Sequence, residues 1–246
     1  MRAVLVRVGI DQAYGHWNAP VDPDTHEFVY VPIPDARALD RGLATPYRSM
    51  RAPLAAFAQG RVVDREACAL PAELRRRNMH LDPDFKWLTY GDNVNTRGSI
   101  IRTLEAGDVA AFYAGLRPCR PGSPRAGALI YALIGLYHVS EVVLVASVAE
   151  ARRHENAHTR RSSPTPGDVI VRARPGASGR LRRCLPIGDL RARAYRVFPE
   201  LLTAWGGLSC KDGYLQRSAV PPRLLDPARF LAWFEAQRPE LHADNR

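Results

Sequence analysis

The longest apolar stretch of the chain, Ala128–Leu136, constrains its fold most strongly. Together with the residues up to Val139, it is apolar at nearly consecutive positions, which is typical of a β-strand buried on both faces. The stretch is much shorter than the roughly 20 residues that a membrane-spanning helix needs. We therefore expect a fold built around a central strand, and no membrane span.

Shorter segments predict further elements around this strand. Strands are expected at Ala3–Val8, Glu27–Ile33, Ile100–Leu104, Val109–Tyr113 and Val169–Val171. Helices are expected at Pro53–Gln59, at Pro71–Asn78, in Glu141–His158, in Pro186–Trp205 and after Asp226-Pro227. This order predicts an α+β fold with a mixed β-barrel centre and flanking helices.

No linker or internal repeat divides the chain. We expect one domain over residues 1–246, with a barrel-like core at roughly 1–34 and 85–175 and a helical C-terminal extension at 186–246. The N-terminus lacks the apolar core of a signal peptide, and the four cysteines form no C-x-x-C pair. These features favour a cytoplasmic protein with reduced thiols.

The chain is strongly basic. Its 246 residues include 35 Lys+Arg and 25 Asp+Glu, for a formal net charge of +10. This excess favours a phosphate backbone as partner, although an arginine-rich composition with only Lys86 and Lys211 as lysines also fits GC-rich coding. The arginines cluster at Arg152–Arg161, Arg172–Arg183 and Arg191–Arg196, after the expected barrel.

A polar and aromatic loop follows the first expected strand. Tyr14 and Trp17 suit stacking on a planar base, and Asp11 and Asn18 suit hydrogen bonds to its edge. The same loop also fits an aromatic plug at the end of a barrel, with Asp11 capping the turn. Both interpretations remain open.

A second group of polar residues lies between His80 and Arg97. In an extended segment His80 and Asp82 point to the same side, which permits an imidazole–carboxylate pair for acid–base chemistry. Tyr90, Asp92 and Arg97 follow near a glycine-permitted bend. Turn residues with a surface ion pair explain the stretch equally well.

The segment His154–His158 matches the zinc-protease pattern H-E-x-x-H. Four arginines flank it and no third ligand follows at a recognisable spacing, which argues against zinc. We assign no metal ligand and no cofactor, and we interpret this arginine-rich segment as a phosphate-binding surface. Further along, Gln216, Arg217 and Ser218 also suit phosphate contacts, or equally a surface strand edge.

Two resemblances emerge from the order of these segments. The part from Gly107-Asp108-Val109 through Phe112-Tyr113 to Ile134-Gly135 and Val139 resembles the EVE/PUA-like barrel. That resemblance covers about 60 residues, and it implies binding of modified or flipped nucleobases.

A second resemblance spans nearly the whole chain. The series VGIDQAYGHWNAP, FVYVPIP, HLDPDF, TYGD, RG, GDVAAFYAGL, IGLYHV, ENAH and QRS is similar to the third nucleotide-modification-associated domain family of phages and bacteria. The match weakens at the second proline of Pro221-Pro222. The resemblance implies DNA base hypermodification, and it implies a site drawn from Asp11, Tyr14, Trp17, Asn18, His80, Asp82, Tyr90, Asp92, Arg97, His158, Gln216 and Arg217.

These observations together predict a DNA-acting enzyme that alters a modified base flipped into a pocket at the barrel mouth, for example by hydrating or hydrolysing a base substituent. The alternative is a non-catalytic EVE-like reader of modified bases. Expected partners are DNA and other DNA-modification proteins. We predict catalytic roles for Asp11, His80, Asp82 and Asp92, base contacts for Tyr14, Trp17, Asn18 and Tyr90, and phosphate contacts for Arg97, His158, Arg160, Arg161, Gln216 and Arg217.

Overall fold

The computed structural model describes residues 1–93, 96–121, 129–215 and 220–246. At its centre lies β7 (Ile130–Leu144), which is continuously buried from Tyr131 to Tyr137. The sequence prediction of a strand buried on both faces is thereby confirmed, although Ala128 itself lies outside the described residues.

The other strands lie around β7. They are β1 (Ala3–Arg7), β2 (Pro20–Val21), β3 (Ile33–Pro34), β4 (Met79–His80), β5 (Thr89–Asp92), β6 (Val109–Pro118), β8 (Val169–Ala173), β9 (Gly179–Arg191), β10 (Ala194–Val197) and β11 (Leu241–His242). Strand β6 pairs in parallel with β1 and in antiparallel with β7.

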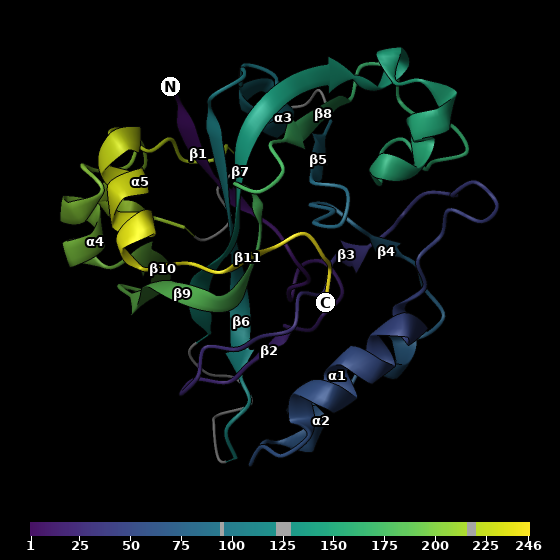
Figure 1. Ribbon diagram of the computed structural model, residues 1–246. Coiled ribbons are helices and arrows are strands. Elements are labelled where there is room, and N and C mark those ends of the chain that lie inside the picture. The colour runs from purple at the N-terminus through teal and green to yellow at the C-terminus, as the bar shows by residue number, and fades with distance from the viewer. Residues whose placement is uncertain (94–95, 122–128, 216–219) are drawn as a thin grey trace.

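Strand β7 changes partner along its length. Its first part pairs with β9. From Val139 onward it pairs with β8, with a register shift between Val139 and Glu141, and β8 in turn pairs with β5. Figure 1 shows β7 curving across the molecule to make both pairings possible. Among the described residues this sheet is mixed and branched and does not close, so the predicted barrel is not confirmed.

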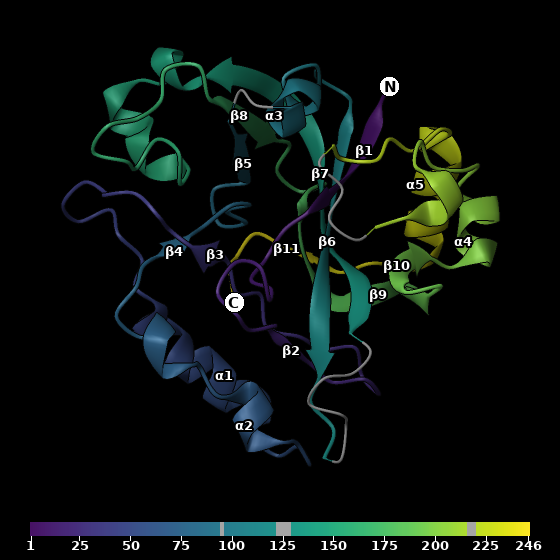
Figure 2. The ribbon, with the colours of Figure 1, turned by 180° about the vertical axis from the view of Figure 1, so that it is seen from behind.

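The helices are short and lie at the margins of the sheet. They are α1 (Arg51–Ala58), α2 (Arg65–Cys68), α3 (Thr96–Ile101), α4 (Pro199–Ala204), α5 (Pro227–Ala236) and the 3₁₀ segments Tyr47–Met50, Ala72–Leu74, Val145–Ser147, Glu150–Glu155 and Lys211–Gly213. In Figure 2, α4 and α5 lie on one side of the sheet and α1 and α2 on the other. The helix expected after Asp226 is confirmed, with the Asp226 carboxylate accepting a hydrogen bond from the Arg229 amide.

Five predicted elements are wrong or shortened. The helix expected at Pro71–Asn78 is only the 3₁₀ turn Ala72–Leu74. In the strand expected at Glu27–Ile33, only isolated bridges form at Glu27 and Phe28, and Ile33 begins β3. The strand expected at Ile100–Leu104 is instead the end of α3 and the turn after it. The helix expected in Glu141–His158 is replaced by the end of β7 and short 3₁₀ turns, because Val142 and Val143 pair with β8. Much of the helix expected in Pro186–Trp205 is instead the hairpin of β9 and β10.

The hydrophobic core draws on both ends of the chain, from Ala3 in β1 to Phe234 in α5. At its centre Phe85 makes edge-on contacts with the rings of Tyr30, Phe112 and Tyr137. No helix in the described part of the chain combines the length and the apolar character needed to span a membrane. The α+β class predicted from the sequence is confirmed.

Candidate functional site

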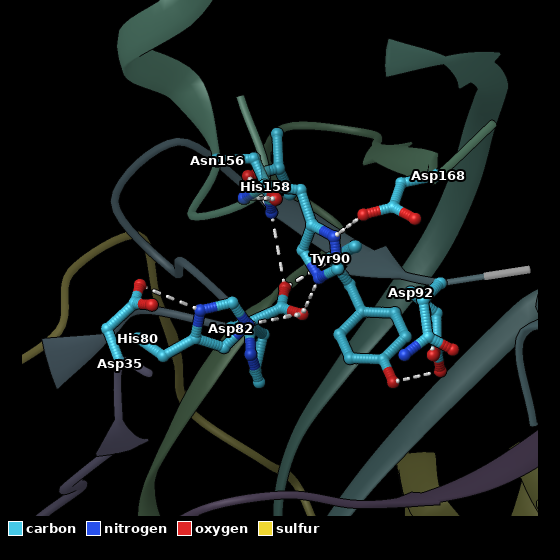
Figure 3. Close-up of polar contacts among 12 residues, drawn as sticks. Asp35, His80, Asp82, Tyr90, Asp92, Asn156, His158 and Asp168 are labelled. Carbon is cyan, nitrogen blue, oxygen red and sulfur yellow. Dashed lines mark hydrogen bonds and ion pairs between the residues drawn. The ribbon is translucent and has the colours of Figure 1, made fainter. Parts of the chain in front are cut away.

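Three polar side chains converge between β4, β5 and the segment after Glu155 (Figure 3). The Asp82 carboxylate Oδ2 lies 3.8 Å from His80 Nε2 and 3.6 Å from His158 Nε2. These separations exceed ordinary hydrogen-bond lengths but lie within ion-pair range, so both imidazoles face the same carboxylate oxygen. We refer to His80, Asp82 and His158 as the His–Asp–His cluster.

The turn that carries Asp82 is held rigidly by aromatic side chains. Tyr30 donates a hydrogen bond to the carbonyl of Pro83 at 2.8 Å, and Tyr137 donates to that of Asp84 at 3.0 Å. Phe85 is fully buried directly after the turn. Because the core anchors both the carbonyls and the following ring, the Asp82 side chain is presented in one orientation.

Two donors orient the Asp82 carboxylate. Its Oδ1 accepts hydrogen bonds from the Gly91 amide at 2.6 Å and from the Asn156 side chain at 3.2 Å. A Cβ at Gly91 would lie 2.6 Å from both Asn156 Oδ1 and His158 Cδ2, so glycine is needed for this close approach. Oδ2 is left to face the two imidazoles.

Each histidine of the cluster contacts a second carboxylate through its other ring nitrogen. His80 Nδ1 lies 3.1 Å from Asp35 Oδ2, and His158 Nδ1 lies 2.6 Å from Asp168 Oδ2. Burial raises the pKa of both aspartates, but the hydrogen bonds to the histidines, together with the charges of the histidines and of Arg161, outweigh it, and the pKa of each is lowered. Because an ionised carboxylate only accepts hydrogen bonds, each Nδ1 carries a proton and each Nε2 points toward Asp82.

The electrostatics of the cluster are those of an anionic pocket. Burial by itself lowers the pKa of His158, but the hydrogen bond to Asp168 and the nearby Asp82 carboxylate raise it from 6.5 to about 9. Arg161 also binds Asp168, at 2.9 Å, and partly offsets this negative charge. The pocket therefore favours a positive charge between the imidazoles and Asp82.

Tyr90 and Asp92, both expected in the site, lie beside the cluster in Figure 3. The Tyr90 hydroxyl donates to Asp92 Oδ2 at 2.9 Å, and its ring packs against Phe112 in the core. Both side chains are buried. They extend the polar region along β5 toward the hydrophobic core.

The loop after β1 lies outside the His–Asp–His cluster, and its polar side chains bind its own backbone or neighbouring strands. The Asp11 carboxylate accepts from the amides of Ala13 and Tyr14, each at 2.8 Å, and pairs with Arg7, so it caps its own turn. Trp17 and Asn18 are buried, and Asn18 donates to the Gly115 carbonyl at 2.7 Å. Only Tyr14, 60 % exposed, presents a ring to solvent among these predicted base contacts.

The arginines expected to contact phosphate are largely engaged by acids. Arg160 is buried in an ion pair with Asp84, and Arg161 with Asp168. Arg152 pairs with Glu155, and Arg153 with Asp40. The backbone of Arg97 lies in α3 but its side chain lies outside the described residues, as do Gln216 and Arg217 entirely.

The H-E-x-x-H match does not form a shared histidine face. Residues Glu150–Glu155 form a 3₁₀ helix that ends before His158. His154 instead contacts the Trp87 ring, with centroids 4.4 Å apart, and Glu155 pairs with Arg172. Of the three defining residues His154, Glu155 and His158, only His158 belongs to the cluster, and Asn156 between them binds Asp82.

Three contributors were missed in the sequence: Asp35, Asn156 and Asp168. Asp35 directly follows β3, whose pairing with β4 places it beside His80. Asp168 directly precedes β8. A polar residue at the end of a strand is only a weak indication of a functional site. The spacing of Asp35, Asn156 and Asp168 along the chain gives no indication that they lie together.

Comparison with known proteins identifies one family model, described as nucleotide modification associated domain 3, which matches residues 2–214. The whole-chain resemblance seen in the sequence is thereby confirmed. Neither the curated proteins nor the solved structures yield a match. The EVE/PUA-like segment therefore stays a prediction.

Proposed function

Because this chain belongs to the nucleotide modification associated domain 3 family, we propose that it is an enzyme that alters a base in DNA, with its reaction centre at the His–Asp–His cluster. The family indicates a role in nucleotide modification. The observation that carries the enzymatic proposal is the convergence of His80, Asp82 and His158 on one point, each held by a further hydrogen bond. Preorganised acid–base groups of this kind are typical of active sites.

The proposed reaction is the addition of water to a base substituent, such as a nitrile, or the hydrolysis of an amide substituent. In hydrolysis the oxygen of water forms a bond to the substituent carbon, the carbon–nitrogen bond breaks, and the departing nitrogen takes up the proton that water releases. The cluster would hold and polarise the water and move this proton. No oxidant or reductant is required.

DNA as the substrate is supported by an exposed arginine run next to the cluster. Arg75, Arg76 and Arg77 are exposed and come shortly before β4, which carries His80. Arg48 and Arg51 are also exposed, on a segment joined to this run by the hydrogen bond from the Tyr47 amide to the Arg77 carbonyl. We call these five residues the arginine surface, and propose that it holds phosphates.

Substrate must reach a cluster that is largely covered. The side chains of Asp82 and His158 are each 6 % exposed, and that of His80 is 11 % exposed. A hollow of about 430 Å³ lies elsewhere, between the residues that follow α3 and the outer part of β7. We infer that the base approaches from the His80 side, toward the arginine surface.

The test is nucleoside mass spectrometry of DNA from cells with and without the gene, and of the same DNA treated with purified protein. We expect the parent protein to change the nucleoside profile, and Asp82→Asn to abolish the change while retaining DNA affinity. Asp212→Asn is the matched control, because Asp212 is exposed and its φ of 50° suits asparagine.

An unchanged profile with the parent protein would overturn the proposal. If the parent still bound DNA tightly under those conditions, the result would favour a reader of modified bases.

A further inference from the structure

We propose that the His–Asp–His cluster binds one divalent transition-metal ion, with His80 Nε2, His158 Nε2 and Asp82 Oδ2 as ligands. Any catalytic role of this metal rests on the proposed function, whereas metal binding itself is a property of the free protein and is measured without DNA. The three atoms lie within 4.8 Å of one another, and they come from β4, from the turn after it and from the segment preceding β8.

The separations fit an unfilled site. Zinc bonds to imidazole nitrogen and carboxylate oxygen are about 2.0–2.2 Å, which places tetrahedral ligands about 3.3–3.5 Å apart. The Nε2–Oδ2 separations of 3.6 and 3.8 Å exceed this by only a few tenths of an ångström. The two Nε2 atoms lie within 4.8 Å of each other, so both imidazoles must turn toward Asp82 Oδ2 to bring the three atoms onto one ion.

The surroundings of the ligands match those of metal sites in proteins. A ligating histidine almost always donates its second ring nitrogen to a carboxylate, a carbonyl or water, which fixes the orientation of the ring. Here Asp35 and Asp168 serve the two histidines, at 3.1 and 2.6 Å. Asp82 is held in the same manner, because Gly91 and Asn156 bind Oδ1 and leave Oδ2 for the metal.

The negative charge of the pocket also favours a bound cation. Asp35, Asp82 and Asp168 contribute three negative charges, and Arg161, bound to Asp168, contributes one positive charge, which leaves −2 when both imidazoles are neutral, as metal ligands must be. Buried charges are costly unless they are paired. One divalent ion balances this sum.

The donor set indicates the kind of metal. Two imidazoles with one carboxylate suit zinc, iron(II) or cobalt(II), whereas magnesium and calcium prefer oxygen ligands. Three protein ligands leave at least one position open, and a metal in such a site supplies a bound water of lowered pKa. The H-E-x-x-H match thus contributes His158 to a different metal site from the one its pattern suggests.

The test is performed on the free, full-length protein. Metal bound after purification is measured by elemental analysis, and the chelator-treated protein is titrated with Zn²⁺ by calorimetry and with Co²⁺ by visible absorption. We expect one ion per chain and a Co²⁺ spectrum of nitrogen and oxygen ligation. Asp82→Asn and His80→Gln are expected to weaken Zn²⁺ binding by at least 100-fold, and Asp35→Asn by about 10–100-fold.

His154→Gln is the matched control, because it removes the other histidine of the same motif and should leave Zn²⁺ affinity unchanged. Circular dichroism of each variant establishes that it is folded. The proposal is overturned if the parent protein binds neither ion stoichiometrically at submillimolar concentrations, or if His154→Gln weakens binding while the folded Asp82→Asn and His80→Gln variants do not.

The two proposals fail separately. Stoichiometric metal binding without any base conversion leaves the metal site standing and removes the proposed enzymatic function. Base conversion by protein shown to be metal-free, unaltered when metal is restored, retains the enzymatic function and removes the catalytic role of the metal, whereas failure of the Zn²⁺ and Co²⁺ titrations overturns the metal site itself.

Discussion

Asp84, two residues beyond Asp82, is only 1 % exposed and is held by residues from three parts of the chain. Its Oδ2 pairs with Arg160, and its Oδ1 accepts from Asn245 at 2.8 Å and from the Lys86 amide at 3.1 Å. At the scale of single residues, this buried carboxylate ties the cluster turn both to the segment that carries His158 and to the C-terminal residues.

Arg160→Met removes the buried cation and leaves the Asp84 carboxylate without its charged partner. We expect a loss of about 3–5 kcal/mol in the free energy of unfolding, because an uncompensated buried charge is strongly destabilising. Urea denaturation measures this loss. The double variant Arg160→Met/Asp84→Asn should recover part of it, and a loss below about 1 kcal/mol in the single variant would show that water already screens the pair.

At the scale of elements, β7 decides where the site lies. Its outer part pairs with β8, and β8 pairs with β5, so that Asp168, which precedes β8, comes near the residues of β5. The pairing of β7 with β8 begins beside His138, whose carbonyl accepts a hydrogen bond at 2.8 Å from the amide of Arg174, the residue after β8. Because β7 bends here, this half-buried histidine reports on the junction between its two pairings.

The pKa of His138 is lowered from 6.5, chiefly by burial and then by Arg174, with Glu235 acting in the opposite direction. The folded state therefore binds fewer protons than the unfolded state below pH 6.5, and stability falls as the pH drops through this range. We expect His138→Gln to lose less stability than the parent between pH 7 and pH 5. NMR titration should give a pKa below 6.5 that rises in Arg174→Gln; a pKa at or above 6.5 would contradict the prediction.

At the scale of the whole molecule, the arginines that give the chain its net charge of +10 include two groups with different surroundings. Arg152, Arg153, Arg160 and Arg161 lie in ion pairs with carboxylates, and so does Arg172. The arginine surface, by contrast, is exposed and adjoins the strand that carries His80. Neutralised arginines stabilise the fold, whereas exposed ones attract phosphates.

We therefore expect the triple variant Arg75→Ala/Arg76→Ala/Arg77→Ala to bind DNA more weakly. The slope of log K against log salt should fall in magnitude by up to about 2.7, because each phosphate contact contributes about 0.9. The control is Arg174→Ala/Arg182→Ala/Arg183→Ala, which removes three exposed arginines near β8 and β9, of which Arg182 pairs with the exposed Glu240. Fluorescence anisotropy over a salt series measures both. A larger loss in the control would place the phosphates on the C-terminal arginines that the sequence pattern favoured.

Local sequence patterns predicted the features that depend on interactions between residues close together in the chain. Continuous apolarity predicted β7, the capping aspartate predicted the start of α5, and the i, i+2 spacing predicted the approach of His80 and Asp82. Strand burial, helix capping and side-chain alternation each act over a few residues, so the sequence alone suffices for them.

Convergence of distant segments was decided by the tertiary structure alone. Asp35, Asp82 and Asp168 meet around two histidines because β3 pairs with β4 and β5 pairs with β8, and no periodicity in the sequence encodes those pairings. The helix expected before His158 failed for the same reason, since pairing with β8 outweighs a weak local preference. The sequence determined the composition of the site and the central strand of its scaffold, and long-range strand pairing determined which carboxylate each histidine faces.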